Sequence, residues 1–250
     1  VFLLENDLIL KVEGICKRFT GTIALDNVNF ELKRGEIHAL VGANGAGKST
    51  LIKILTGAYR SDSGKIFLDG KQVEINSPSA ARRLGISAVY QEFSLVNNLT
   101  VAENIYLGKL PRNKSLINTV NWSEAYKNAY EILKHMDSCI DPKALVKNLS
   151  VAQRQLVEIA KALSNNSRIL IMDEPTASLT DNDIENMFKV IKGLANKGIS
   201  IIYVSHRLEE LPVIADRVTV FRDGKYIVTL NIEDAPKQVI IDNMVGKGLT

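Results

Sequence analysis

The stretch GANGAGKS at residues 42–49 has the glycine spacing and the final Lys-Ser pair of a phosphate-binding loop. It follows the apolar run EIHALV (36–41) and leads into TLIKILTG (50–57), so we expect a strand, a tight loop and a helix in succession. In this arrangement backbone N–H groups and the positive end of the helix face the phosphates of a nucleotide. The sequence therefore predicts a triphosphate site. A glycine-rich turn that binds nothing is the structural alternative.

The side chains of this loop have distinct expected roles. Lys48 is expected to reach the β- and γ-phosphates and to act in catalysis, and the Ser49 hydroxyl is expected to bind Mg²⁺. The residues expected to contact the nucleotide here are Gly42, Asn44, Gly45, Ala46, Gly47, Lys48, Ser49 and Thr50.

Two adjacent acids, Asp173 and Glu174, follow the apolar run in ILIMDEPT (169–176). The carboxyl end of a buried strand is where open α/β sheets bind ligands. Because two acids there are costly unless they serve a cation or a water, we expect Asp173 to bind Mg²⁺ and Glu174 to polarise the attacking water. The alternative is that both acids merely end the strand and face solvent.

Of the three histidines, His206 is the candidate for the site, because it follows the apolar run ISIIYV (199–204). Its imidazole could hydrogen-bond the γ-phosphate of a nucleotide. Considered alone, a helix cap before RLEEL (207–211) is the more common role for such a residue. His38 and His135 are expected in a strand and a helix, without a role in the site.

Six apolar, β-branched runs are expected to position these groups. They are LILKV (8–12), EIHALV (36–41), ISAVY (86–90), RILIM (168–172), ISIIYV (199–204) and RVTVF (217–221). Several are nearly continuous in apolar residues, which is typical of strands buried on both faces. Helical patterns lie between them, and this alternation predicts a parallel sheet covered by helices.

Two helical patterns are well marked. Between residues 180 and 198, Thr180 and Asp183 can cap a helix that Gly198 ends. Its apolar stripe is Ile184, Met187, Phe188, Ile191, Leu194 and Ala195. A second helix is expected after the capping pair Asn121 and Glu124, with a stripe of Trp122, Tyr126, Ala129, Leu133 and Met136.

The segment 93–149 interrupts the strand–helix alternation, because it contains helical patterns but no convincing buried strand. We interpret it as an inserted helical subdomain within one 250-residue domain, whose core subdomain is 1–92 and 150–250.

Composition and charge narrow the class of protein. Hydrophobic residues make up 46% of the chain and the net charge is +3, which is typical of globular proteins and too weak to indicate nucleic-acid binding. No apolar run approaches the ~18–20 residues of a membrane span, and the first ten residues do not resemble a signal peptide. Cys16 and Cys139 have neither metal-ligand nor disulfide spacing, so a reducing, intracellular compartment fits best.

The stretch LSVAQRQLVEIAKAL (149–163) predicts a helix capped by Ser150. Its apolar stripe is Ala152, Leu156, Ile159, Ala160 and Leu163. Arg154 and Glu158 are expected as an i,i+4 pair on the other side.

With this stretch the chain resembles the ATP-binding cassette family, whose signature Leu-Ser-Gly-Gly-Gln precedes the same strand. The phosphate loop, Gln91 in AVYQEF, this helix, ILIMDEPT and YVSH occur in the family's order. The stretch 77–108 and the signature helix look like the first cassette of the tandem ATPases of bacterial ribose, galactose and xylose importers. The resemblance implies an α/β P-loop NTPase fold, with a parallel-sheet core, an N-terminal antiparallel β layer and an inserted α-helical subdomain.

The resemblance also implies a mechanism. Two cassettes close face to face around two ATP molecules, and hydrolysis lets them open and so drives uptake of a simple sugar through a membrane permease. The partners implied are a second cassette (homodimer or tandem half), integral permease subunits that meet the segment from Glu92 to Tyr106, and, indirectly, a sugar-binding protein outside the membrane. The protein would then lie peripherally on the cytoplasmic face of the cell membrane.

Four further residues receive roles from the resemblance alone. Ser150 and Gln153 would face the nucleotide held by the opposite cassette. Phe19, in CKRFTG, would stack on adenine, although a core or surface aromatic is the alternative. Gln91 would bind Mg²⁺ or its water and act in catalysis where the core meets the helical subdomain.

The sequence departs from the family pattern at two places. The two signature glycines are Val151 and Ala152, which places side chains where backbone would approach a phosphate and leaves the hydrolysis rate open. After ILIMDEPT, the usual Asp is Thr180, so communication between two ATP sites also stays open.

Three other classes of protein fit the sequence less well. A cassette that structures or repairs DNA would carry long coiled coils, and residues 49–149 lack sustained heptads. An ATP-gated module on the ribosome would be distinguished by its partner. A P-loop kinase would leave the signature helix and His206 unexplained.

Overall fold

The computed structural model describes residues 7–113 and 119–246, and its main sheet has six strands in the order β10-β9-β3-β8-β7-β6. The strands are β3 (Ile37–Val41), β6 (Ile86–Val89), β7 (Ile169–Asp173), β8 (Ser200–Val204), β9 (Arg217–Arg222) and β10 (Lys225–Asn231). All pairs are parallel except β9 with β10. Five of the six predicted runs form strands of this sheet, so the predicted parallel sheet is confirmed for them. The sixth run, LILKV (8–12), lies instead in the second, antiparallel sheet.

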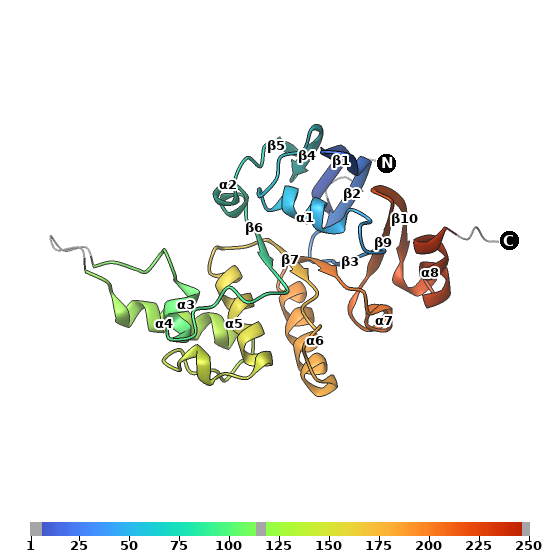
Figure 1. The fold of residues 1–250 in the computed structure, drawn as a ribbon. Coiled ribbons are helices and arrows are strands. Elements are labelled where there is room, and N and C mark those ends of the chain that lie inside the picture. Colours follow the sequence, from blue (N-terminus) through green and yellow to red (C-terminus); the bar gives the residue numbers. More distant parts are fainter. Residues whose placement is uncertain (1–6, 114–118, 247–250) are drawn as a thin grey trace.

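A second, antiparallel sheet has the order β2-β1-β4-β5 and lies at the top of Figure 1. Its strands are β1 (Leu8–Phe19), β2 (Thr22–Lys33), β4 (Ser63–Leu68) and β5 (Lys71–Val73). With helix α1 (Lys48–Leu55), it buries one face of the main sheet, where Ile169 and Ile171 of β7 join Leu51 and Ile52 of α1. The expected N-terminal antiparallel layer is confirmed.

The opposite face of the main sheet packs against helices. Leu170 and Met172 of β7 belong to the same buried cluster as Ile159 of α5 (Val151–Leu163) and Ile191 of α6 (Asp181–Asn196). Successive residues of β7 thus face opposite sides of the sheet, which is why its sequence is continuously apolar. The remaining helices are α2 (Pro78–Arg83), α3 (Val101–Ile105), α4 (Trp122–His135), α7 (Leu211–Ile214) and α8 (Lys237–Val245), with 3₁₀ turns at Val146–Asn148, Leu208–Glu210 and Ile232–Asp234.

Helix α6 agrees with its prediction at every position of the stripe, since all six apolar residues are buried. Thr180 accepts a hydrogen bond from the Asp183 N–H, and Gly198 after the helix has φ +88. The expected start and end of this helix are confirmed.

The segment 93–149 projects to the left in Figure 1 and, where described, holds α3 and α4 but no strand. Asn121 caps α4 by accepting from the Glu124 N–H at 3.1 Å, as expected. The apolar stripe of α4 is only partly right, because Trp122 is 43% exposed. Residues 114–118 of the segment lie outside the described part. The subdomain boundary stays a prediction, because α5 packs on α3 and α4 as well as on β6.

The helix α5 differs from its prediction in two respects. Of the predicted apolar stripe, Ile159 and Ala160 are buried, whereas Ala152, Leu156 and Leu163 are only half-buried. Glu158, expected on an outer face beside Arg154, is buried and accepts hydrogen bonds from the backbone and hydroxyl of Ser94. Arg154 instead donates to the carbonyl of Lys147. Helix α5 packs against both the core and the helical subdomain. The apolar periodicity of the helix does not predict its contact with the helical subdomain. Within residues 7–113 and 119–246, no helix combines the length and apolar character needed to cross a bilayer.

Candidate nucleotide site

The loop between β3 and α1 is held by two glycines in close contact with neighbouring backbone. A Cβ atom on Gly42 would lie 2.3 Å from the carbonyl oxygen of Phe221. At Gly47, with φ +99, a Cβ would lie 2.7 Å from the carbonyl oxygen of Ala24. Only glycine fits both places, and the loop therefore brings its N–H groups and the N-terminus of α1 to one edge of the sheet.

Lys48 lies across this loop. Its ammonium donates to the carbonyl oxygen of Gly42 at 2.6 Å and to that of Ala43 at 3.1 Å. Burial lowers the pKa of Lys48, while the negative charges of Glu174 and Asp173 oppose that shift. The lysine and the two acids thus belong to one electrostatic environment. Of the other loop residues, Asn44, Gly45 and Ser49 are exposed, Thr50 is half-buried and Ala46 is buried.

The two acids lie where β7 ends, beside β8. Burial raises the pKa of Asp173, and the adjacent Glu174 raises it further. Glu174 has φ +51, a left-handed conformation that is strained for a glutamate, and its N–H donates to the Val204 carbonyl at 2.9 Å. The chain therefore turns sharply after Asp173, and both carboxylates remain half-buried at the sheet edge rather than fully in solvent.

His206 approaches Glu174 directly. Its Nδ1 lies 2.9 Å from Oε1 of Glu174, and its side chain is 60% exposed. The imidazole thus faces the acid, and Arg207 is the N-cap of the following 3₁₀ turn. This pairing brings together two residues that follow different strands of the sheet, β7 and β8. His38 is a buried strand residue of β3, as expected, with Nε2 2.7 Å from the Thr219 hydroxyl.

The N-terminus of α5 is exposed and closed by a reciprocal pair of hydrogen bonds. The Ser150 hydroxyl accepts from the Gln153 N–H, and the Gln153 side chain accepts from the Ser150 N–H at 3.0 Å. The predicted cap is confirmed. Val151 is 41% exposed, so the side chain that replaces a signature glycine points outward. Ser150 makes these bonds within its own helix, and its roles toward a nucleotide stay predictions.

Phe19 and Gln91 lie at the surface. Phe19 ends β1, is 42% exposed, and meets Tyr59 edge-on with ring centroids 5.3 Å apart. Phe19 is therefore a surface aromatic residue. It lies in the same β1–β2 hairpin as Ala24, whose carbonyl oxygen is next to Gly47. Gln91 is exposed just after β6. Their contacts with adenine and Mg²⁺ stay predictions.

Comparison with known proteins agrees with this geometry. The sequence pattern described as ABC transporter matches residues 25–177. The chain belongs to this family. A ribose import ATP-binding protein, RbsA 1 of Rubrobacter xylanophilus, is 49% identical over 96% of this chain and 48% of its own length. A galactose/methyl galactoside import ATP-binding protein, MglA of Clostridium tetani, is 47% identical over 99% and 49%.

Solved structures of ABC cassettes share the fold. The cbiO1 protein of Clostridium perfringens, part of an ABC transporter complex, is 29% identical with a TM-score of 0.80, covering 97% of this chain and 96% of that one. A dimeric, post-hydrolysis ATP-binding cassette with ADP and Pi bound is 26% identical with a TM-score of 0.73, covering 89% and 98%. The predicted family and fold class are confirmed. The chain spans about half the length of the two curated relatives.

The donor atoms of this ABC cassette fit a hard divalent cation. The Asp173 carboxylate and the Ser49 hydroxyl are oxygen ligands, which Mg²⁺ prefers. Among the described residues, no group of three or more His, Cys, Asp or Glu can hold a metal alone. Such a sparse donor set suits an ion whose other ligands are phosphate oxygens and water.

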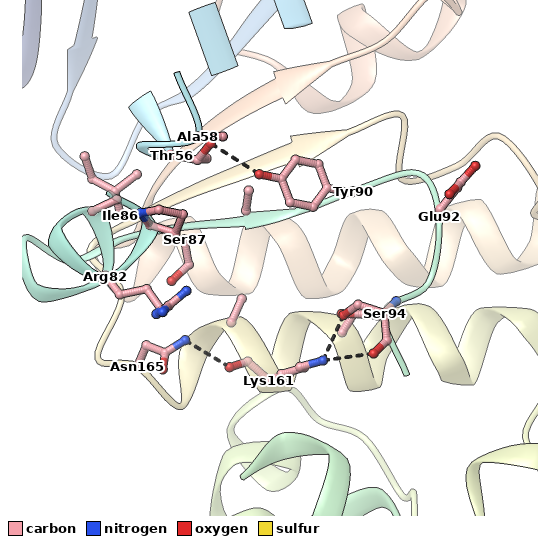
Figure 2. Close-up of a pocket in the computed structure, with 15 residues that line it drawn as sticks. Thr56, Ala58, Arg82, Ile86, Ser87, Tyr90, Glu92, Ser94, Lys161 and Asn165 are labelled. Carbon is pink, nitrogen blue, oxygen red and sulfur yellow. Dashed lines mark hydrogen bonds between the residues drawn. The ribbon is translucent and has the colours of Figure 1, made fainter. Parts of the chain in front are cut away.

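The cassette also has a pocket of about 350 Å³ between the segment after β6, helix α2 and helix α5 (Figure 2). Tyr90 donates to the Thr56 hydroxyl at 3.2 Å on one side, and Lys161 donates to the Ser94 hydroxyl at 2.8 Å on the other. Arg82 and Glu92 add charge to its lining. The pocket thus adjoins Gln91 and the helical subdomain at once.

Sequence reasoning missed one buried polar group near the site. Glu210 is 5% exposed and accepts hydrogen bonds from Tyr203 and Thr176. Nothing in the stretch RLEEL (207–211) distinguishes Glu210, which is buried, from its neighbour Glu209, which is exposed. The tyrosine in the mostly aliphatic run ISIIYV (199–204) was a signal in the sequence for a polar atom in the core that needs a partner.

Proposed function

We propose that the chain is an ATP-hydrolysing cassette that drives uptake of a simple sugar through a membrane permease. The observation that carries this proposal is the 49% and 47% identity to ribose and galactose import proteins over nearly the whole chain. The grouping of Lys48, Asp173, Glu174 and His206 near one edge of the sheet supports hydrolysis as the source of the driving force.

ATP binds with its phosphates over residues 42–49. The N–H groups at the start of α1 and the Lys48 ammonium offset the phosphate charge. Lys48 exchanges its two carbonyl partners for phosphate oxygens as the nucleotide enters. Phe19 stacks on the adenine from the neighbouring hairpin, and its position at the surface, 42% exposed, supports this contact. When bound, Mg²⁺ offsets charge that develops on the phosphate oxygens, and Ser49, Asp173 and Gln91 are the residues that hold it or its water.

Hydrolysis uses Glu174 as the general base. Its carboxylate accepts the proton of a water molecule while that water's oxygen bonds to the γ-phosphorus and the bond to the β-phosphate oxygen breaks. His206 hydrogen-bonds Glu174 through Nδ1 and the γ-phosphate through Nε2. The 2.9 Å separation of Nδ1 and Oε1 supports this arrangement, because one imidazole orients the base and contacts the reacting phosphate.

Closure of two cassettes completes each site. Ser150 and Gln153 at the exposed start of α5 face the γ-phosphate held by the opposite cassette, with the positive helix end behind them. The dimeric state of a solved cassette supports this proposal. The second cassette is either another copy of this chain or the other half of a tandem protein, and the greater length of the curated relatives, about twice that of this chain, supports the tandem form.

The permease meets the cassette at the pocket beside Gln91. Its lining joins the core, through Thr56, Tyr90 and Lys161, to the helical subdomain, through Ser94. A permease segment seated there would contact both parts at once and so respond to their relative position (Figure 2).

A sugar-binding protein acts indirectly, through the permease. The cassette then lies peripherally on the cytoplasmic face of the membrane. Both curated relatives are named for import, and neither is named for DNA or the ribosome.

The test is the variant Glu174→Gln, which keeps the shape of the base but cannot accept the proton. Hydrolysis should fall by about 100-fold or more, and ATP should hold the cassettes together as a closed pair in gel filtration. The matched control is Glu185→Gln on the exposed face of α6, which should hydrolyse ATP at the parent rate. Parent-like hydrolysis by Glu174→Gln would contradict the assignment of the base. Co-purification with ribosomes rather than with an integral membrane protein would contradict the role in import.

A further inference from the structure

Four buried side chains form a hydrogen-bonded group beside the segments that carry Glu174 and His206. We call it the Glu210 cluster, and its members are Thr176, Tyr203, Ser205 and Glu210. Tyr203 donates to Oε2 of Glu210 at 2.7 Å, and the Thr176 hydroxyl lies 2.9 Å from Oε1. Ser205 lies farther, with its hydroxyl 3.4 Å from Oε2. Each side chain is at most 5% exposed, so the carboxylate depends on these donors rather than on water.

The cluster joins two chain segments that carry the proposed catalytic groups. Thr176 lies two residues after Glu174, and Ser205 lies directly before His206. The Ser205 hydroxyl also accepts from the Arg207 N–H at 2.9 Å, which fixes the turn that contains His206. Glu210 follows in the next 3₁₀ turn and reaches back to both segments. One carboxylate therefore links the segment after β7 to the segment after β8.

The Glu210 cluster supplies the hydrogen bonds and the positive charge that a buried carboxylate requires. A buried carboxylate is costly unless hydrogen bonds and a nearby positive charge compensate for lost water. Here two hydroxyl groups donate at close range, and Nε of Arg207 lies 3.3 Å from Oε1. Burial and the charge of Glu210 raise the pKa of the Tyr203 phenol, so it remains a protonated donor. Moving either segment would leave a buried polar atom without its partner, and such a fully paired network resists displacement.

We propose that Glu210 is a positioning residue for ATP hydrolysis, which holds Glu174 and His206 at the separation needed for catalysis. The inference rests on the proposed function, since it acts through the roles given there to Glu174 and His206. Glu210 is buried against Thr176, Tyr203 and Ser205, so it acts through these neighbours. Its effect is to keep the Thr176 and Ser205 segments in fixed register, and with them the base and the imidazole.

The first test compares Glu210→Gln with Glu209→Gln. Both remove one negative charge from the same 3₁₀ turn, but Glu209 is exposed and pairs only loosely with Lys237 at 3.8 Å. In Glu210→Gln we expect kcat to fall by about 10- to 100-fold, as for a small misplacement of reacting groups. KM for ATP should stay within about twofold, because the phosphate loop is untouched. Glu209→Gln should match the parent in both constants.

A second variant keeps the proposal testable even if Glu210→Gln does not fold. Tyr203→Phe removes one donor from Glu210 and preserves the ring, so it should fold and lower kcat by about 3- to 10-fold. Adding Tyr203→Phe to Glu210→Gln should cost little more, because both act through one network. Circular dichroism and thermal unfolding confirm that the variants are folded. Equal losses in kcat and in ATP affinity would overturn the proposal, since they indicate general damage to the domain.

The outcome for Glu174→Gln separates this inference from the proposed function. If Glu174→Gln stops hydrolysis while Glu210→Gln and Tyr203→Phe behave as Glu209→Gln does, the positioning role is wrong and the proposed function stands. If Glu174→Gln hydrolyses ATP at the parent rate, the assignment of Glu174 as the base fails, and the positioning role fails with it.

Discussion

Gly47 packs against Ala24 so closely that a methyl group on the glycine would lie 2.7 Å from the Ala24 carbonyl oxygen. The contact joins the phosphate loop to strand β2 of the antiparallel sheet. The sheet therefore does more than cover the core, because it also determines the path of the chain into α1. The Leu25 side chain restricts the same space from a second direction, also at 2.7 Å.

The first prediction concerns Gly47→Ala. We expect the free energy of unfolding to fall by about 2 kcal/mol or more, because the new Cβ is strained at φ +99 and overlaps the β2 backbone. The matched control is Gly193→Ala in the last turn of α6, where a Cβ meets open space. That change should raise stability by about 0.5–1 kcal/mol, from helix propensity. Urea unfolding measures both, and a stability of Gly47→Ala equal to the parent would contradict the packing described.

The second prediction separates the two roles of Ser150. Ser150→Asp retains an N-cap side chain, so stability should change by only about 0.5 kcal/mol. The added negative charge should repel the γ-phosphate of the opposite cassette and abolish ATP-dependent pairing of the Glu174→Gln protein, as measured by gel filtration. The control is Thr100→Asp, which alters the same kind of cap on α3. Undiminished pairing of the Ser150→Asp protein would remove Ser150 from the proposed interface.

The third prediction is a pH dependence of stability. Burial raises the pKa of Glu36, but the neighbouring His38 and Arg217 outweigh that effect and hold it at about 2. A depressed folded-state pKa stabilises the fold above the ordinary value of 4.5, and this contribution is lost as the pH falls toward 2. The loss should amount to about 3 kcal/mol on complete protonation. Urea unfolding between pH 6 and pH 2 measures it.

The variant Glu36→Gln tests the source of that loss. It should be less stable at pH 6, because Arg217 loses the partner that it contacts at 2.5 Å. It should also lack the part of the acid transition that Glu36 contributes. Glu233→Gln, outside the buried core, should keep the parent profile. An unchanged acid profile in Glu36→Gln would show that other groups cause the transition.

The fourth prediction concerns the pocket in Figure 2. Ala58 lines it and is exposed, so Ala58→Trp fills the space without disturbing the core. Co-purification with the permease should fall by about 10-fold or more, as expected when an interface anchor pocket is filled. ATP affinity should be unchanged. Val213→Trp, at an exposed position of α7, is the control for added surface hydrophobicity. Full permease binding by Ala58→Trp would exclude this pocket as the docking site.

Local patterns predicted the elements that position the site. The phosphate loop, the strand ending at Asp173 and the buried stripe of α6 follow from residues near one another in sequence, where period and spacing are strong signals. The antiparallel layer was expected only from the family resemblance. Its long first strand pairs with both β2 and β4, and that pairing is not visible in either strand alone.

What the sequence did not show depends on distant contacts. Glu158 looks like an exposed partner of Arg154 on a helical projection, but it lies against Ser94, 64 residues earlier. Glu210 looks like any surface acid, and its partner Thr176 lies 34 residues away. Trp122 is apolar, yet it remains exposed beside Tyr126. In each case tertiary packing, rather than local periodicity, decides the environment of the side chain.

The two ends of helix α5 lie at two different proposed contacts of the cassette. Ser150 begins it, and Lys161 in its last turn lines the pocket beside Gln91. Thirteen residues of α-helix make a rod of roughly 20 Å, buried along much of its length. Because such a rod does not compress, a shift of the pocket wall displaces the Ser150 tip by a comparable amount. In the proposed importer, mechanical work would thus pass between the permease at the pocket and the nucleotide that faces Ser150 along a single stiff helix.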